Sequence, residues 1–234
     1  LAILLISLTP TAKAQIIRHE LIPFESASLS IANVLTGANG EKLIVAGSLR
    51  VPKAAKKPPV VILMPPPLGV GTGWGQVDEW SRVLHEASIA TFAIDSFSPR
   101  GIYTLAGAIN LPLITRWPDV FGARAALKNH PLIDFNRIAV MGFSHGAPSA
   151  LYTNLVRFQK MYNETPFAGH ISVYGPCGVR FRHDERIASP LMLLHGTADD
   201  WVPAAPCRDY PARLKNAGGD VRLIEYPDAH HAFD

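Results

Sequence analysis

The most constraining feature of this sequence is a series of short, uninterrupted apolar runs separated by longer segments of helical periodicity. Val60–Met64 reads VVILM, and Leu191–Gly196 reads LMLLHG. A strand with apolar side chains on both faces is typical of a parallel sheet covered by helices on both sides. We therefore expect about eight strands, at Ser28–Leu35, Lys42–Val51, Val60–Met64, Ala90–Ile94, Arg137–Gly142, Gly169–Tyr174, Leu191–His195 and Val221–Tyr226.

The segments between these runs predict a mostly parallel, doubly wound α/β sheet with right-handed crossovers. No helix separates the first two strands, so we expect them to form an antiparallel hairpin at one edge. Ligands of such sheets bind beyond the carboxyl ends of the strands, where functional residues should therefore be sought. The expected helices are Val77–Ala87, Trp117–Asn129, His145–Met161 and Ala205–Ala217.

Length and composition favour a single domain. The 234 residues are 48% hydrophobic, which is enough to bury one sizeable core. A net charge of +3 without any basic block does not predict a nucleic-acid partner. We expect residues 15–234 to form one α/β domain, incomplete at its C-terminus because such a fold normally adds a closing helix.

The first residues have the pattern of an exported protein. Leu1–Leu8 is apolar, and Ala12-Lys13-Ala14 follows as an A-x-A cleavage site. The run is too short to span a bilayer, so residues 1–14 are interpreted as the remnant of a signal peptide rather than a buried strand or membrane anchor. We therefore expect a secreted or periplasmic protein without a membrane span in its mature form. In such a compartment Cys177 and Cys207 are expected to form a disulfide, with two buried thiols as the alternative.

A serine motif follows the fifth expected strand. Gly142-Phe143-Ser144-His145-Gly146 fits G-x-S-x-G, with a strand before it and a helix after it. The two glycines allow strand and helix to approach around a sharp turn that exposes the serine hydroxyl. Since the bare pattern also arises by chance, it is the strand–turn–helix context that makes it specific. Ser144 is the candidate nucleophile.

A serine nucleophile needs a base and a group that orients the base. For this turn the chain order is serine, acid, histidine. Asp199 and Asp200 follow the strand that ends in LMLLHG, and His230 and His231 follow the last strand. The order and position match, although one of the aspartates also fits a turn residue and the histidines fit a solvated loop.

At these residues the chain resembles the dienelactone hydrolase family of α/β-hydrolases. The resemblance extends from about Leu43 to Phe233 and depends on DSFSPRG, GFSHG, HGTADDWVP and YPDAHHAFD. It implies that Asp199 is the acid and His231 the base. The named dienelactone hydrolases carry cysteine as nucleophile, whereas this chain has Ser144, as does the broader esterase-like branch. The resemblance implies hydrolysis of a small carboxylic ester or lactone through an acyl-enzyme, without metal or cofactor.

Substrate contacts are predicted at the rim of the site. Family relatives use an arginine near Arg100 for a substrate carboxylate, and a structural arginine that binds loop carbonyls is the alternative. Trp74, Trp201 and Tyr174 are candidates for the walls of an apolar pocket, although aromatic residues at strand ends often serve packing alone.

The oxyanion hole is the least regular part of the pattern. One expected donor is the backbone N–H of His145, and the other comes from the loop after the third strand. The resemblance aligns H-G-x-G-G with Pro65-Pro66-Pro67-Leu68-Gly69, which places Pro67 at a donor position although proline has no N–H. Either Leu68 or Gly69 donates, with Leu68 favoured, or the hole depends on His145 alone. A weakly catalytic, ligand-binding relative and a peptidase of the same fold are the competing interpretations.

Overall fold

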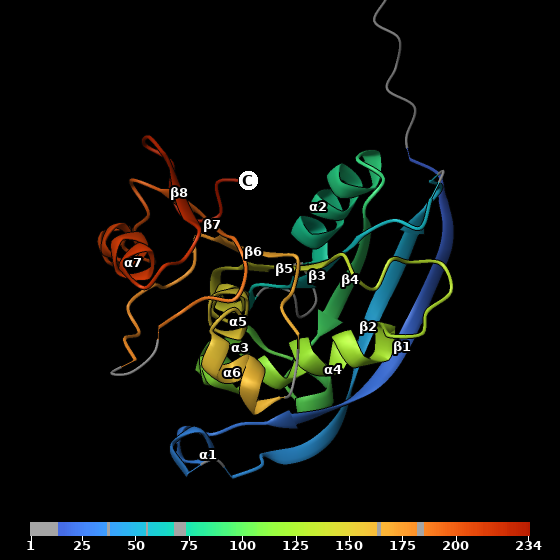
Figure 1. Ribbon diagram of the computed structural model, residues 1–234, viewed down its shortest axis with the longest axis horizontal. Helices are drawn as coiled ribbons and strands as arrows, with labels where there is room; N and C mark the ends of the chain where they lie inside the picture. Colours follow the sequence, from blue (N-terminus) through green and yellow to red (C-terminus); the bar gives the residue numbers. More distant parts are fainter. Residues whose placement is uncertain (1–13, 37, 55, 68–73, 163–164, 182–184) are drawn as a thin grey trace, which may run out of the picture.

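The computed structural model describes residues 14–36, 38–54, 56–67, 74–162, 165–181 and 185–234. Within these ranges it describes the side chains of all residues except 34, 35 and 74. An eight-stranded sheet runs through the molecule in the order β1-β2-β4-β3-β5-β6-β7-β8 (Figure 1). Strands from β4 to β8 along this order are parallel, whereas β2 is antiparallel to both β1 and β4. The strands are β1 Ile16–Ser28, β2 Glu41–Pro52, β3 Val60–Met64, β4 Ala90–Asp95, β5 Ile138–Phe143, β6 Gly169–Val173, β7 Leu191–Gly196 and β8 Val221–Tyr226.

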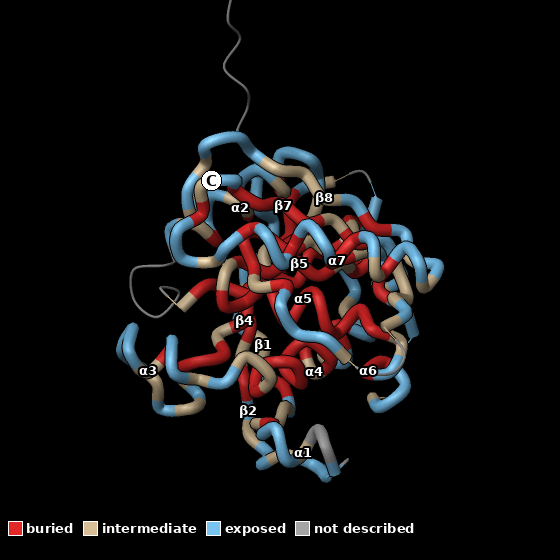
Figure 2. Tube along the Cα trace, turned by 90° about the vertical axis from the view of Figure 1, so that its left-hand side faces the viewer, coloured by how far each residue is buried: buried red, intermediate tan, exposed pale blue. Residues whose placement is uncertain are grey.

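Helices cover both faces of the sheet, as the apolar runs predicted. In β3, Val60, Ile62 and Met64 contribute to one buried cluster, and Val61 and Leu63 contribute to the other. The first cluster includes side chains of α4, α5, α6 and α7, and the second includes Val77 of α2. Figure 2 shows the resulting buried centre with exposed segments around it. The helices are α1 Ile31–Thr36, α2 Trp74–Glu86, α3 Leu105–Asn110, α4 Trp117–Leu127, α5 Ala147–Thr153, α6 Val156–Met161 and α7 Ala205–Asn216, with 3₁₀ turns η2 Ser98–Arg100, η3 Leu113–Arg116 and η4 Ser144–Gly146.

The first expected strand, Ser28–Leu35, was wrong. The strand is β1, which ends at Ser28, and residues 31–36 form α1 instead. The side chains of Ser30 and Asn33 each accept a hydrogen bond from the other's backbone N–H, which stabilises the start of a helix. The edge hairpin itself is present, because β1 pairs with β2 in antiparallel register.

The expected helix His145–Met161 is divided. The backbone of Leu155 is extended, which separates α5 from α6. Asn154 explains the interruption, because its side chain accepts hydrogen bonds from the N–H groups of Ala188 and Ser189 and donates one to the Ser189 carbonyl. A side chain that binds a distant loop in this way favours a local break over continued helix.

A short helix that the sequence pattern did not predict lies beside the site. α3 begins after Thr104, whose side chain accepts a hydrogen bond from the N–H of Gly107.

Within the described part of the chain, no helix combines the length and apolar character needed to cross a membrane.

Candidate functional site

Three segments far apart in sequence meet at the carboxyl ends of β5, β7 and β8. Ser144 follows β5, Asp199 lies three residues after β7, and His231 lies five residues after β8. In the parallel sheet these three ends lie at the same edge, with β6 between β5 and β7. The topology therefore places the predicted nucleophile, acid and base at one point.

The turn that carries Ser144 is sterically constrained. Ser144 has a φ of 48°, in the left-handed region that a non-glycine residue adopts at a cost of about 1–3 kcal/mol. A Cβ atom on Gly142 would lie 2.3 Å from the carbonyl oxygen of Gly146, and one on Gly146 would lie 2.1 Å from that of Met64. Gly142 therefore allows the turn to close on itself, and Gly146 allows it to approach β3.

Hydrogen bonds connect the three side chains in a line. Ser144 Oγ lies 2.9 Å from His231 Nε2, and His231 Nδ1 lies 2.9 Å from Asp199 Oδ2. Asp199 Oδ1 accepts further hydrogen bonds from the backbone N–H groups of Trp201 and Val202. Because the carboxylate cannot donate, His231 Nδ1 carries a proton and Nε2 can accept the one on Ser144. The arrangement can activate the serine hydroxyl.

The neighbouring acid and histidine lie outside this line. The side chains of Asp200 and His230 are 65% and 71% exposed and lie 3.7 Å from each other. The Asp199 side chain, in contrast, is fully buried. Asp199 and His231, the pair that the family resemblance selected, are the ones that the fold brings to Ser144.

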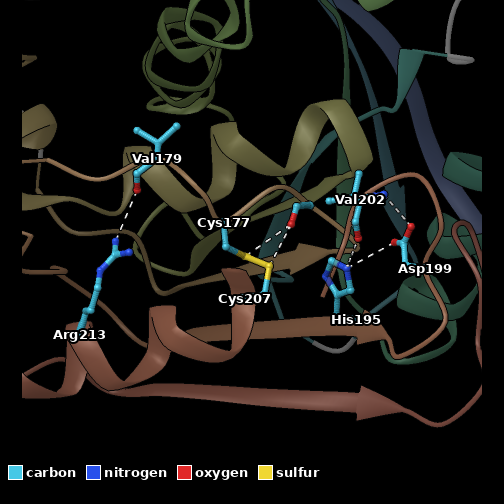
Figure 3. Close-up of a disulfide and its surroundings, with 8 residues drawn as sticks. Cys177, Val179, His195, Asp199, Val202, Cys207 and Arg213 are labelled. Atoms are coloured by element: carbon cyan, nitrogen blue, oxygen red, sulfur yellow. Dashed lines mark hydrogen bonds and ion pairs between the residues drawn. A yellow bond between two sulfur atoms is a disulfide. The ribbon is translucent and has the colours of Figure 1, made fainter. Parts of the chain in front are cut away.

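A disulfide joins Cys177 to Cys207 beside the site, with a Cα–Cα distance of 4.9 Å. Cys177 lies in the loop after β6, and Cys207 lies in the first turn of α7 (Figure 3). Both sulfur atoms contact the carbonyl oxygen of Gly175, at 3.4 and 3.3 Å. The bridge therefore holds the loop after β6 against the helix that follows the Asp199 turn.

His195 contacts the turn that carries Asp199. Its Nε2 atom lies 2.8 Å from the carbonyl oxygen of Val202 and 3.4 Å from Asp199 Oδ2 (Figure 3). A hydrogen bond to the backbone on the far side of the turn fixes the position of the loop that carries Asp199.

Ser144 and His231 open into an apolar pocket of about 240 Å³. Trp201 is stacked on the His231 ring at 5.4 Å, and Tyr174 meets that ring edge-on at 4.9 Å. Trp201 and Tyr174 therefore line this pocket, and the side chain of Trp74 lies outside the described residues. None of the described residues that line the pocket is Lys, Arg, Asp or Glu. The other lining residues are Pro66, Pro67, Gln76, Leu105, Ile109, Leu113, His145, Pro176, Val202 and Ala232.

Polar partners hold the Tyr174 side chain in place. Its hydroxyl oxygen accepts a hydrogen bond from Gln76 and donates one to Asp234, which also accepts from Trp80. Burial raises the pKa of the Tyr174 hydroxyl, so the group stays protonated at neutral pH. Tyr174 is therefore a neutral wall of the pocket.

Arg100 does not reach this pocket. Its guanidinium forms two hydrogen bonds to the Asp119 carboxylate, and its side chain is 5% exposed. Its other N–H groups bind Ser28 Oγ and the carbonyl oxygens of Ala27, Ser96 and Thr115. The structure therefore does not bring Arg100 to this pocket, and its contacts are those of the alternative, a structural arginine. The reason is that Asp119, on α4, supplies a buried carboxylate that the local sequence does not reveal.

Arg116 is the arginine that contacts the site, although no motif in the sequence indicates it. It is fully buried at the end of η3. One of its terminal nitrogens lies 3.2 Å from His145 Nδ1, and the other donates to the Pro65 carbonyl at 2.9 Å. A single arginine between apolar residues in LPLITRWPDVF was its one signal in the sequence.

His145 is held as a neutral imidazole. An arginine can only donate, so His145 Nδ1 accepts and Nε2 donates to the Leu111 carbonyl at 2.9 Å. Burial, followed by the charge on Arg116, lowers the pKa of His145 to about 4. His145 therefore carries no charge at neutral pH.

The oxyanion loop is only partly described. Pro66 and Pro67 line the pocket next to Ser144, whereas Leu68 and Gly69 lie outside the described residues. The prediction of Leu68 as a donor stays a prediction. His145, the other predicted donor, directly follows Ser144 and lines the same pocket.

Comparison with known proteins places these features in a family. The model of the dienelactone hydrolase family matches residues 115–234, the part that contains Ser144, Asp199 and His231. Esterase LipQ of Mycobacterium tuberculosis is 44% identical over 57 residues, which are 24% of this chain and 13% of LipQ. Acylamino-acid-releasing enzyme of Arabidopsis thaliana is 27% identical over 128 residues, which are 55% of this chain and 16% of that enzyme. The chain thus matches only a small part of either curated relative.

Solved structures share the fold. A putative dienelactone hydrolase from Klebsiella pneumoniae has a TM-score of 0.64 at 18% identity, over 92% of this chain and 88% of that chain. At this identity the likeness extends to the arrangement of the sheet and its helices.

Proposed function

The chain belongs to the dienelactone hydrolase family, and from that membership we propose that it cleaves carboxylic esters or lactones with Ser144 as nucleophile. The observation that carries the proposal is the continuous line of hydrogen bonds from Ser144 through His231 to Asp199. This line ends at an open apolar pocket, which is where a substrate carbonyl must lie for attack.

In the acylation step, Ser144 Oγ attacks the ester carbonyl while His231 Nε2 accepts the hydroxyl proton. Asp199 stabilises the imidazolium that forms and keeps the proton on Nδ1 in the correct tautomer. The negative charge that develops on the carbonyl oxygen is bound by the His145 N–H. When the tetrahedral intermediate collapses, the C–O bond breaks and the leaving alkoxide receives the proton from His231.

Deacylation repeats these proton transfers with water as the nucleophile. His231 removes a proton from the water, which attacks the acyl-enzyme carbonyl, and then returns that proton to Ser144 Oγ. The products are the carboxylic acid and the regenerated serine hydroxyl. Each of these proton transfers uses Ser144, His231 and either the alcohol group of the substrate or water.

The pocket favours small, uncharged substrates. Its volume of about 240 Å³ is smaller than the roughly 300–1,000 Å³ that is typical of sites for drug-sized ligands. A carboxylate bound there would lose its hydration without gaining a cationic partner among the described lining residues, which is unfavourable. This pocket supports a neutral acyl or alcohol group and argues against a preference for acidic esters.

The disulfide supports an oxidising location. Disulfides persist in secreted and periplasmic proteins, and the bridge between Cys177 and Cys207 is fully buried. We retain secretion or periplasmic export as a proposal. The signal-peptide remnant on which it also depends covers residues 1–14, of which 1–13 lie outside the described residues.

The test compares Ser144→Ala and His231→Ala with His230→Ala, using p-nitrophenyl butanoate and a fluorophosphonate probe. We expect the first two variants to lose at least about a thousandfold in kcat, and His230→Ala to keep wild-type turnover. Full hydrolysis by Ser144→Ala would contradict the proposal. Labelling of the wild-type protein without turnover would instead favour a ligand-binding relative, and faster cleavage of an acyl-peptide than of esters would favour a peptidase.

A further inference from the structure

Arg116 carries a buried positive charge that Asp119 and Asp95 favour only at longer range. The side chain is fully buried, and no carboxylate among the described residues lies within ion-pair distance of it. Asp119 is bound by Arg100 instead. Burial lowers the pKa of Arg116 to about 9, so the guanidinium remains charged at neutral pH. Burying a cation that forms no direct ion pair lowers stability, so this position points to a role beyond stability.

The contacts of Arg116 join the two segments that border the nucleophile. One terminal nitrogen donates to the carbonyl oxygen of Pro65, the first residue after β3, and the other donates to His145 Nδ1. Its guanidinium carbon also lies 4.5 Å from the centre of the Phe97 ring, which gives the charge a cation–π contact. A single side chain thus connects the start of the Pro65-Pro66-Pro67 segment to His145, the residue after Ser144.

These contacts lie next to the part of the site that lacks backbone N–H donors. Pro65, Pro66 and Pro67 have no N–H, so this part of the loop cannot bind an oxyanion through its backbone. The Pro65 carbonyl is nevertheless held in place by the hydrogen bond from Arg116. His145 Nδ1 is held by the same guanidinium, and the backbone N–H of this residue is the proposed oxyanion donor.

We propose that Arg116 is the positioning residue of the oxyanion hole, and that its buried charge stabilises the anion that forms beside the His145 N–H. In this role it offsets the donor that the proline run cannot provide. The inference rests on the proposed serine hydrolase function. A cation that is fixed in the buried interior stabilises developing negative charge more strongly than one in water, and it needs no reorganisation during the reaction.

The kinetic test uses Arg116→Met and Arg116→Lys, with Arg124→Met as the matched control. Arg124 lies on α4, is buried, stacks on Phe167 and does not line the pocket. We expect Arg116→Met to lower kcat for p-nitrophenyl butanoate by about ten- to a hundredfold while KM changes less than about threefold. Arg116→Lys keeps a charge and should retain an intermediate kcat. Arg124→Met should lower the melting temperature without lowering kcat.

A second readout follows His145 itself by ¹⁵N NMR of the imidazole. The wild-type ring should be neutral, with the proton on Nε2, throughout pH 5–8. In Arg116→Met the pKa of His145 should rise, because the neighbouring charge that lowers it is gone. A purely structural arginine would leave kcat unchanged in a folded variant, even though the ring loses a neighbouring charge.

The outcomes separate the two proposals. If wild-type protein hydrolyses the ester and Ser144→Ala does not, then unchanged kcat in a folded Arg116→Met or Arg116→Lys variant overturns the role of Arg116 alone. If neither variant folds, the ¹⁵N NMR spectrum of His145 in the wild-type protein is the test. Titration of this ring between pH 5 and 8 would then overturn the role of Arg116. Activity that survives in Ser144→Ala overturns the serine hydrolase function itself.

Discussion

At the scale of single residues, burial separates Asp199 from Asp200 although the two are adjacent. The Asp199 carboxylate is fully buried and accepts hydrogen bonds from His231 and from two backbone N–H groups. The Asp200 side chain is 65% exposed and its ionic neighbour is the exposed His230. An exposed pair of this kind contributes little to stability or positioning.

Asp199→Asn is expected to lower kcat by about a thousand- to ten-thousandfold, because an amide can donate to His231 Nδ1 and so favour the wrong tautomer. Asp200→Asn provides the matched control and should stay within about twofold of wild type, since its side chain is solvated. The measurement is steady-state hydrolysis of a p-nitrophenyl ester. Equal losses in the two variants would contradict the assignment of Asp199.

At the scale of elements, α3 gives the pocket an apolar rim. Leu105 and Ile109 of this helix line the pocket and are 42% and 51% exposed, and Trp201 on the same pocket is 69% exposed. Apolar side chains exposed around an opening are typical of a binding surface. We therefore expect this helix to affect which substrates bind, although it carries none of the proposed reacting groups.

Charge selectivity should respond to this rim. We expect wild-type kcat/KM for p-nitrophenyl butanoate to exceed that for mono-p-nitrophenyl succinate by at least about tenfold, because the carboxylate loses hydration without a cationic partner. Ile109→Lys should reduce that ratio by adding a cation at the rim. Val83→Lys, at an exposed position of α2 outside the pocket, should leave it unchanged. A wild-type preference for the succinate ester would contradict a neutral pocket.

At the scale of the whole molecule, the disulfide restrains a large loop. It joins residues 30 apart, which corresponds to about 3–4 kcal/mol of stabilisation in the loop-entropy description. The double variant Cys177→Ser/Cys207→Ser should therefore melt roughly 10 °C below the oxidised protein. Scanning calorimetry with and without reductant measures this. If the melting temperature of the wild-type protein does not change when the disulfide is reduced, the predicted stabilisation by the bridge is contradicted.

Three buried histidines should make the fold sensitive to acid. Burial lowers the pKa values of His85 and His145 to about 4 and that of His170 to about 3. The unfolded chain, with ordinary histidine pKa values near 6.5, binds more protons between about pH 6.5 and 4. The free energy of unfolding should therefore be highest above pH 6.5 and fall as the pH decreases, by up to about 1.4 kcal/mol per pH unit for each histidine.

Denaturation by urea across pH 4–8 measures this dependence. His170→Asn should reduce the slope between pH 6.5 and 4, because it removes one buried titrating ring. His230→Asn, which changes an exposed ring, should not alter that slope. A free energy of unfolding that stays constant from pH 6.5 to 4 would exclude the effect.

Local patterns explain how much of the architecture was predictable. The strands β3 to β8 and the helices α2, α4 and α7 agree closely with the expected ranges, because apolar periodicity reports directly on burial. The prediction failed at Ser28–Leu35, where side-chain hydrogen bonds of Ser30 and Asn33 start a helix. It also failed at Leu155, where Asn154 binds a loop more than thirty residues away.

The sequence by itself determined the sheet, the steric need for Gly142 and Gly146, and the order of serine, acid and histidine. Only the tertiary structure decided which arginine binds a carboxylate and which contacts His145, the residue after Ser144. Arg100 and Arg116 have the same chemistry, but one meets Asp119 and the other meets Pro65 and His145. The physical reason is that burial and hydrogen-bond partners depend on contacts between distant segments, which no local pattern contains.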